Sequence, residues 1–394
     1  MYFDFNEKSS ILFLFFFHGL VFGKLLLLKG FQNDEKSNFW LSGFTLLCSF
    51  YIAPFMCGYA DWYGSLPYRD VLFYVPFQQV LLLPPVLYYY IKTLLDKSFK
   101  FSKKDFLHFV PAIAYLIYSI VVFVTDKVVL NDYYFYEDQQ DKDLDAWYQV
   151  AGFISLVYYL ILSLKVYGQY KKIIYNTISF ADTMLFRWAK RLLIAFLLLL
   201  AIRALFFVLN PEWGEFGKKF WYYVCFSLLF YFISIYGFVN SVRSIISFHE
   251  ITSDTNSIDD VPTNVVANDI QNSNGYETQN LPLWKTRIET LMLEEHLYEN
   301  PELTLMEVCD RLGTHSKKIS EVINQGYGLN FNDFINHYRT KAVIHRLEKG
   351  DHTNVTLLSI ALDCGFNSKS TFNRAFKRYT NQTPKEYIET YLKK

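Results

Sequence analysis

The chain has 394 residues, long enough for two or three domains, and its 38 Lys and Arg residues balance its 38 Asp and Glu residues to a net charge of +0. Hydrophobic residues make up 52% of the chain and aromatic residues 19%, fractions that are high for a soluble protein. The composition therefore argues against a protein that is soluble throughout. The balanced charge averages unlike regions and indicates no particular class of partner.

Apolar stretches about 20 residues long fill the first two-thirds of the chain, and each could cross ~30 Å of hydrocarbon as a helix. The N-terminus, MYFDFNEKSS, lacks the basic region of a signal peptide, so we expect the first stretch to be retained. Trp, Tyr and Phe flank several of the stretches, as expected at headgroup level. We predict seven spans: Ile11–Leu28, Phe39–Tyr59, Val71–Ile91, Phe106–Thr125, Trp147–Val166, Trp188–Leu209 and Phe220–Val242.

The loop charges predict an orientation for these spans. With the N-terminus outside, the inner segments hold fourteen Lys and Arg residues against six in the outer segments, the bias that the positive-inside rule requires. The longest outer loop, Asp126–Ala146, holds seven Asp and Glu residues. An odd number of spans then places the C-terminus in the cytoplasm. We therefore predict a multi-pass protein of the cytoplasmic (inner) membrane, with the N-terminus outside.

Three polar residues in the spans are predicted to lie about 10 Å below the outer surface, from a rise of about 1.5 Å per residue: His18, Gln78 and Arg203. No Asp or Glu lies within a span to pair with Arg203, so an anionic ligand could complete a pocket lined by the three side chains. The alternative is that Arg203 extends its guanidinium to the headgroups. The pocket is a hypothesis that the direction of these side chains tests.

A polar segment follows the last span. It is rich in Asn, Asp, Ser and Thr and cannot bury enough apolar surface to fold alone. We predict a membrane domain over residues 1–243, a flexible linker over 244–282 and a further domain over 283–394. The linker is either a spacer or a slack tether, and a slack tether would transmit a signal by changing the proximity or pairing of two chains.

Residues 283–394 are predicted to contain two helix-turn-helix units. In the first, Leu305–Leu312 has helical apolar spacing, Gly313 supplies the turn, and Lys317–Asn324 forms the second helix. In the second, Leu357–Leu362 precedes a turn, and the helix Lys369–Tyr379 follows it. The amphipathic stretch Phe331–Leu347 lies between the units. A short Gly-containing turn followed by a polar helix is what insertion into a DNA groove requires.

The second unit closely resembles the AraC/XylS family of bacterial transcription regulators. The resemblance rests on Ile360-Ala361, Gly365-Phe366, Ser368, Ser370, Phe372, Arg374, Phe376-Lys377, Thr383-Pro384 and Tyr387. The first unit and the segments Gly328–Phe331 and Tyr338-Arg339 resemble the same domain, so the likeness covers about Leu283–Leu392. The overall expectation is an all-α protein: a seven-helix membrane bundle followed by a helical domain with two helix-turn-helix motifs.

The resemblance implies two recognition helices that enter successive major grooves on one face of DNA, near Ser316–Asn324 and Lys369–Tyr379. It implies that Ser368 caps the second of these helices and that Phe372 and Phe376 face the core. Two residues depart from the family pattern. His315 replaces a capping Ser, so Thr314 or Ser316 is expected to cap instead. Asn381 replaces a Gly, and Asn also adopts the left-handed conformation. The expected DNA contacts are Ser316, Lys317, Lys318, Ser320, Asn324, Lys369, Ser370, Asn373, Arg374, Lys377 and Arg378.

The sequence therefore predicts a membrane-embedded one-component transcription regulator that binds double-stranded DNA in response to a signal, either a small molecule or a membrane protein. A homodimer is left open. One alternative is a membrane-anchored DNA-binding protein whose spans bind a partner, and another is a membrane enzyme or transporter with a regulatory tail. None of the five cysteines has metal-ligand or redox spacing, and no catalytic motif occurs. We expect no enzyme activity, no cofactor and no metal.

Overall fold

The computed structural model describes residues 3–96, 99–138, 140–184, 187–209, 219–240 and 281–392. These residues form helices and short helical turns, and their one β pairing is an isolated bridge between Ile178 and Thr304. The all-α prediction is confirmed. The contacts divide the chain into two compact units: unit 1 is Met1–Tyr167 with Phe186–Ser247, and unit 2 is Gly168–Leu185 with Phe248–Lys394.

This division differs from the predicted one in a single described segment. Residues 168–184 follow the fifth expected span, yet they pack with the C-terminal domain in unit 2. The predicted linker, 244–282, lies almost entirely outside the described residues. The domain boundaries at 243 and 283 stay predictions.

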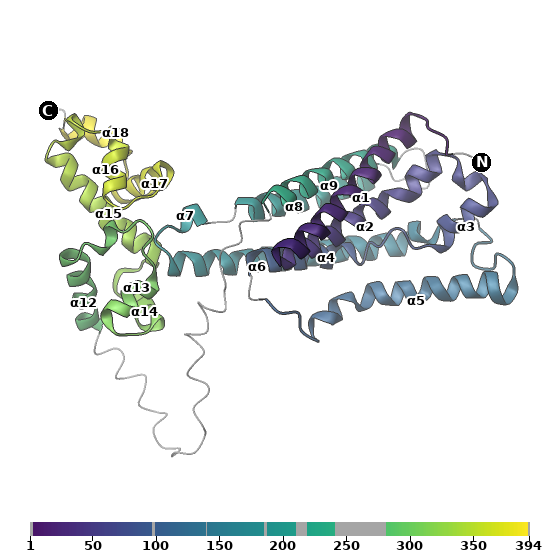
Figure 1. Ribbon diagram of the computed structural model, residues 1–394, viewed down its shortest axis with the longest axis horizontal. Coiled ribbons are helices and arrows are strands. Elements are labelled where there is room, and N and C mark those ends of the chain that lie inside the picture. The colour runs from purple at the N-terminus through teal and green to yellow at the C-terminus, as the bar shows by residue number, and fades with distance from the viewer. Residues whose placement is uncertain are drawn as a thin grey trace, which may run out of the picture. The chain divides into compact units, whose positions relative to one another are not determined.

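Unit 1 is a bundle of apolar helices in which α1 packs along α2, and α9 contacts α1, α2 and α8 (Figure 1). Small residues allow the close approach of α1 and α2, since a Cβ on Gly19 would meet Ser49 at 1.7 Å and one on Gly23 would meet Leu46 at 2.7 Å. The longer helices of this bundle are α1 (Glu7–Asn33), α2 (Lys36–Tyr59), α4 (Leu83–Leu95), α5 (Val110–Val124), α6 (Ala146–Thr177), α8 (Arg187–Leu209) and α9 (Phe220–Asn240).

The third expected span, Val71–Ile91, is not a continuous helix. It consists of α3 (Leu66–Tyr74) and α4, separated by a non-helical stretch that contains Pro76. The break frees backbone groups, and side chains from elsewhere in unit 1 satisfy them. The Gln78 N–H donates to Asp143 Oδ2 (2.8 Å), and Tyr148 donates its hydroxyl to the Gln78 carbonyl (2.9 Å). A helical break within a bundle is tolerated where protein groups replace the lost bonds in this way.

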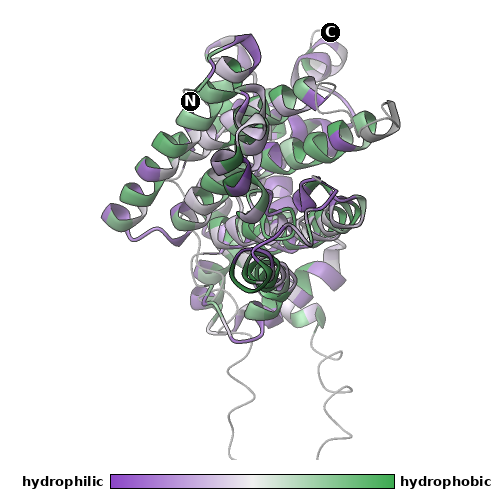
Figure 2. Ribbon diagram, turned by 90° about the vertical axis from the view of Figure 1, so that its right-hand side faces the viewer, coloured by the Kyte–Doolittle hydropathy of each residue, from purple (hydrophilic) through white to green (hydrophobic). Residues whose placement is uncertain are grey.

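Five helical segments of the described residues are long and apolar enough to cross a membrane: Glu7–Asn33, Lys36–Tyr59, Asp105–Leu130, Ala146–Thr177 and Phe220–Asn240. Helix α8 is formed where the sixth span was expected, but it is not among these five segments. The third expected span, Val71–Ile91, is interrupted. The count of seven spans is therefore not confirmed. Hydrophobic residues, green in Figure 2, recur along the helices, while the turns between them contain more hydrophilic residues.

Unit 2 contains the C-terminal helices and has two hydrophobic cores that share helix α15. The first core includes Ile288, Val308 and Phe334, and the second includes Val343 and Phe372. All five cysteines of the chain are free, and four of them are buried. The helices of unit 2 are α7 (Ala181–Met184), α12 (Leu281–Glu294), α13 (Leu305–Leu312), α14 (Ser316–Tyr327), α15 (Phe331–Glu348), α16 (Leu357–Asp363), α17 (Lys369–Thr380) and α18 (Pro384–Tyr387), together with the last turns of α6.

Candidate nucleic-acid interface

The first helix-turn-helix unit consists of α13 and α14. Thr304 caps α13 in a capping box with Glu307, and Gly313 ends the helix in the left-handed conformation at φ +61°. The N-cap of α14 is His315, whose side chain makes no capping hydrogen bond. The expectation that Thr314 or Ser316 would cap α14 is therefore wrong. Thr314 lies outside the helix and Ser316 inside it, so the extended N-cap position falls on His315 itself.

The second unit, α16 and α17, has the local structure that was expected. Gly365 forms the turn at φ +91°, and a Cβ there would lie 2.3 Å from the Tyr298 carbonyl oxygen. Ser368 caps α17 by accepting the Thr371 N–H at 3.2 Å. Asn381 ends the helix in the left-handed conformation at φ +60°. Phe372 is buried with 2% of its surface exposed, so the predicted inner face of α17 is confirmed.

The residues predicted to contact DNA lie on the outer faces of α14 and α17. In α14, Lys317 and Asn324 are exposed, and Asn324 donates to Ser320 at 3.4 Å. Ser316, Lys318 and Ser320 are half-buried. In α17 all six expected residues are exposed: Lys369, Ser370, Asn373, Arg374, Lys377 and Arg378. The contact of these side chains with DNA stays a prediction.

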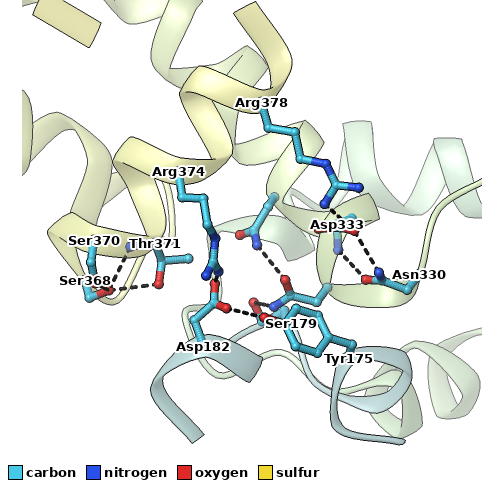
Figure 3. A network of polar contacts seen from close by, with 12 residues as sticks. Tyr175, Ser179, Asp182, Asn330, Asp333, Ser368, Ser370, Thr371, Arg374 and Arg378 are labelled. Atoms are coloured by element: carbon cyan, nitrogen blue, oxygen red, sulfur yellow. Dashed lines mark hydrogen bonds and ion pairs between the residues drawn. The ribbon is translucent and has the colours of Figure 1, made fainter. Parts of the chain in front are cut away.

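Two of the exposed arginines of α17 are already ion-paired within unit 2 (Figure 3). Arg378 pairs with Asp333 of α15 at 2.6 Å, and Asp333 also accepts a hydrogen bond from Asn330 at 2.7 Å. Arg374 pairs with Asp182 of α7, a residue from the middle of the sequence. The sequence predicted that these arginines contact DNA, and it did not indicate their carboxylate partners.

The sequence also did not indicate the burial of Arg339. This side chain on α15 is 1% exposed and hydrogen-bonds to the carbonyl oxygens of Tyr298, Asn300 and Ser179 at 2.8, 2.7 and 3.2 Å. Burial lowers the pKa of Arg339 to about 9. A buried guanidinium requires such a set of acceptors, and its neighbours in sequence supply only Asn336.

In unit 1 the structure brings together two of the three residues of the hypothetical ligand pocket. Arg203 donates to the Gln149 carbonyl and side-chain oxygens at 2.8 and 2.9 Å, and Gln149 donates to Gln78 Oε1 at 3.0 Å. His18 lies apart from them and hydrogen-bonds to Ser234 at 2.7 Å. Arg203 is 8% exposed, so it does not extend into solvent. A ligand site at these residues stays a prediction, and the structure favours Gln78 and Arg203 over His18 as its members.

Comparison with known proteins assigns the C-terminal part of the chain. Residues 308–390 match a family model described as a helix-turn-helix domain. An uncharacterized HTH-type transcriptional regulator of Staphylococcus aureus (strain COL) is 34% identical over 95 residues, which are 24% of this chain and 12% of that protein. The probable transcription factor PqrA of Proteus vulgaris is 26% identical over 97 residues, 25% of this chain and 77% of that protein. No solved structure matches the chain significantly.

These likenesses are confined to the C-terminal domain, and the chain spans only 12% of the length of the Staphylococcus aureus relatives. Within that domain, the family match over residues 308–390 begins inside α13 and covers the rest of both helix-turn-helix units of the structure, α13–α14 and α16–α17. Residues 308–390 are therefore similar to the helix-turn-helix domains of transcription regulators, in agreement with the AraC/XylS motifs of the sequence.

Proposed function

We propose that this protein is a membrane-embedded transcription regulator in which unit 1 receives a signal and helices α14 and α17 bind a DNA sequence. The observation that carries the proposal is the presence, in one chain, of a helix-turn-helix domain and of long helices whose apolar residues face outward. A regulator of this kind would need no relay between its receiver and its gene.

The outward-facing apolar residues support a membrane location for unit 1. In the most apolar 18-residue stretch of Asp105–Leu130, only 17% of the residues are buried. In the corresponding stretch of Glu7–Asn33, 22% are buried. The exposed side chains on α5 include Leu116, Ile117 and Ile120, which water would solvate poorly. Exposed apolar surface on this scale is typical of helices that contact lipid or a partner. Lipid is favoured because these helices also have the length of a span.

The exposed cations of α17 support the DNA-binding half of the proposal. Lys369, Arg374, Lys377 and Arg378 share the outer face of a helix whose opposite face is packed into the core. In helix-turn-helix proteins this is the helix that enters the major groove, where Arg recognises guanine by two parallel hydrogen bonds. We therefore assign base recognition to Arg374 and phosphate contact to Lys377.

The buried polar network of unit 1 supports a receiving role. Arg203 carries a charge, and each of its hydrogen-bond partners described above is an oxygen of Gln149, a neutral residue. A buried cation whose partners among the described residues are neutral raises the affinity of its surroundings for an anion. We propose that a signal with a carboxylate or phosphate group binds beside Arg203 and Gln78. Such a signal would act only through a difference in affinity between two packing states of the bundle.

The test is to map the DNA sites that the full chain occupies in cells, and then to measure binding to one mapped site in vitro. Arg374→Ala should weaken specific binding by about 1–3 kcal/mol and relax the preference at one base pair. Lys377→Ala should weaken binding to all duplexes alike. It should also reduce the slope of log affinity against log salt concentration by about one. A chain that occupies no sites in cells, or that is recovered entirely free of membranes, would refute the proposal.

A further inference from the structure

A short segment between α6 and α8 is built into the surface of the DNA-binding domain. Ile178 pairs with Thr304 in an antiparallel bridge, and the Ser179 N–H donates to the Leu303 carbonyl at 3.0 Å. Asn332 donates to the Ser179 carbonyl at 2.8 Å. Residues 178–181 are all buried. The segment 178–182, of sequence ISFAD, therefore occupies a fitted groove beside the first turn of α13 and the first half of α15.

Arg339 forms the floor of this groove. Its guanidinium donates to both the carbonyl oxygen and the hydroxyl of Ser179, at 3.2 and 3.0 Å. Without the segment Arg339 would lose these two acceptors, and a buried charged donor that lacks acceptors is costly. If the segment left the groove, water could reach the guanidinium and replace both bonds. The groove thus has two satisfied states, one closed by Ser179 and one hydrated.

The last residue of the segment reaches the second recognition helix. Asp182, whose side chain is 8% exposed, pairs with Arg374 and accepts a hydrogen bond from the Tyr175 hydroxyl at 2.6 Å (Figure 3). The end of α6 lies on the same side, since Lys171, Lys172, Arg374 and Arg378 line one open cleft of about 540 Å³. The end of α6 therefore flanks the face of α17 that carries Arg374 and Arg378, whose side chains are still 58% and 64% exposed.

With the end of α6 beside it, α17 cannot enter a major groove. The groove is about 12 Å wide, and an α-helix with its side chains fills about 10–12 Å, so there is no room for α6 beside α17. The cleft holds a group of the size of a few side chains, far smaller than a duplex. Asp182 adds a second obstacle, because its carboxylate occupies the guanidinium of Arg374 and repels phosphates.

We propose that the groove around Arg339 is a docking surface for the segment Ile178–Asp182 of the same chain, and that docking masks α17 from DNA. The proposal rests on the proposed function, and it adds the part of the receiver that the DNA-binding domain recognises. A signal that favours release of the segment would raise DNA affinity, and one that favours docking would lower it.

The docking surface can be tested without DNA by a disulfide. Antiparallel partners such as Ile178 and Thr304 have Cα atoms about 4.5–5.5 Å apart, within the range that a disulfide spans. The full chain with Ile178→Cys and Thr304→Cys should therefore oxidise to an intrachain disulfide in native membranes. The two single variants show the background from the native cysteines, and Thr304→Cys alone measures the loss of the α13 cap. Absence of the disulfide in the double variant would overturn the docking surface.

The masking is tested by DNA binding of the same double variant to a mapped duplex. The oxidised chain should bind the duplex at least about tenfold more weakly than the reduced chain. Reduction should restore the affinity of the single Thr304→Cys variant. Equal affinity of the oxidised and reduced chains would overturn the masking. A chain that binds no mapped duplex in either state would refute the proposed function, and the disulfide would still decide whether the segment docks.

A charge substitution tests the role of Asp182 separately. Asp182→Asn keeps the size of the side chain and removes the ion pair with Arg374, so it should raise affinity for the mapped duplex several-fold. The matched control is Glu295→Gln, which removes a carboxylate from the same unit, where it pairs with Arg311 at 2.8 Å. An equal gain in both variants would mean that net charge, and not the contact with Arg374, sets the affinity.

Discussion

Four described glycines of unit 2 have positive φ angles, among them Gly313 at +61° and Gly365 at +91°, and of the four only Gly365 lies against other atoms. We expect Gly365→Ala to cost about 3 kcal/mol, from left-handed strain and from the contact of its Cβ with the Tyr298 carbonyl. Gly313→Ala has open space around it and should cost about 1 kcal/mol. Hydrogen exchange of α15 and α16 in the full chain measures both losses. Equal losses would show that the contact with Tyr298 relaxes freely.

Single residues were predictable where their role depends on neighbours in sequence. Ser368 and Phe372 were assigned correctly because the resemblance to the AraC/XylS family placed a cap and an inward-facing position there, and both roles depend on residues close in sequence. The burial of Arg339 was not predictable in the same way. Its acceptors on Ser179 lie 160 residues away in sequence, so no local pattern indicates that this guanidinium leaves water.

At the scale of helices, α14 and α17 differ in their N-caps, and the difference can be measured. His315 gives α14 no side-chain cap, whereas Ser368 caps α17. We expect His315→Ser to stabilise the domain by about 0.5–1 kcal/mol, and Ser368→Ala to destabilise it by about 1 kcal/mol. Denaturant unfolding of the full chain in detergent, followed by exchange of the α14 and α17 amides, gives both values. A destabilising His315→Ser would mean that the imidazole contributes in another way.

The broken third span shows which features of a helix its sequence does not determine. A proline such as Pro76 favours a kink, but the length of the break depends on groups that replace the lost backbone bonds. Those groups are Asp143 and Tyr148, which lie more than 60 residues further along the chain. Asp143 belongs to the predicted outer loop, so a residue expected to be solvated stabilises the interior of the bundle instead.

This arrangement predicts a pH dependence of unit 1. Asp141 and Asp143 are nearly buried, and burial raises the pKa of both carboxyls above their ordinary value. A raised pKa means that the folded state binds protons more tightly than the unfolded state. The stabilisation that these two carboxyls give the folded state is therefore full below about pH 4, and it is lost as the pH rises through the raised pKa values. We expect the Tm of the full chain in detergent to fall over this range.

Asparagine variants identify the groups responsible for the fall in Tm. Asp141→Asn keeps an acceptor for Tyr63 and removes one charge, so it should flatten the decline. Asp138→Asn is the control, because the Lys142 ammonium lowers the pKa of Asp138 instead of raising it. A decline that persists unchanged in Asp141→Asn would assign the pH dependence to other groups.

At the scale of the whole molecule, the sequence predicts two unlike parts, because composition changes sharply between them. It could not indicate that residues 168–184 pack with the second part. That assignment depends on tertiary contacts of Ser179 and Asp182, whose sequence surroundings read as an ordinary inner loop. Composition therefore indicates the two parts of the chain, but it does not indicate that the short segment 168–184 of the first part packs with the second.

The broken helix makes the topology of the whole chain a sharp prediction. If α3 and α4 together cross the membrane, seven crossings put the two ends of the chain on opposite sides. If they enter and leave on one face, six crossings put both ends on the same side, and every loop after α4 changes sides. The charges favour seven, since 99–104 contains Lys100, Lys103 and Lys104, whereas 131–138 contains Asp132, Glu137 and Asp138.

We therefore expect a reporter inserted in residues 99–104 to behave as cytoplasmic, one in 131–138 as external, and one after Asn240 as cytoplasmic. Paired fusions with one reporter that works only outside and one that works only inside give each site a positive signal. A fourth insertion after Asn33, in the first inner loop, fixes the orientation before the break. If that site is cytoplasmic and 99–104 is external, α3 and α4 do not cross. The C-terminal domain would then lie outside, away from DNA, and the proposed membrane regulator would fail with it.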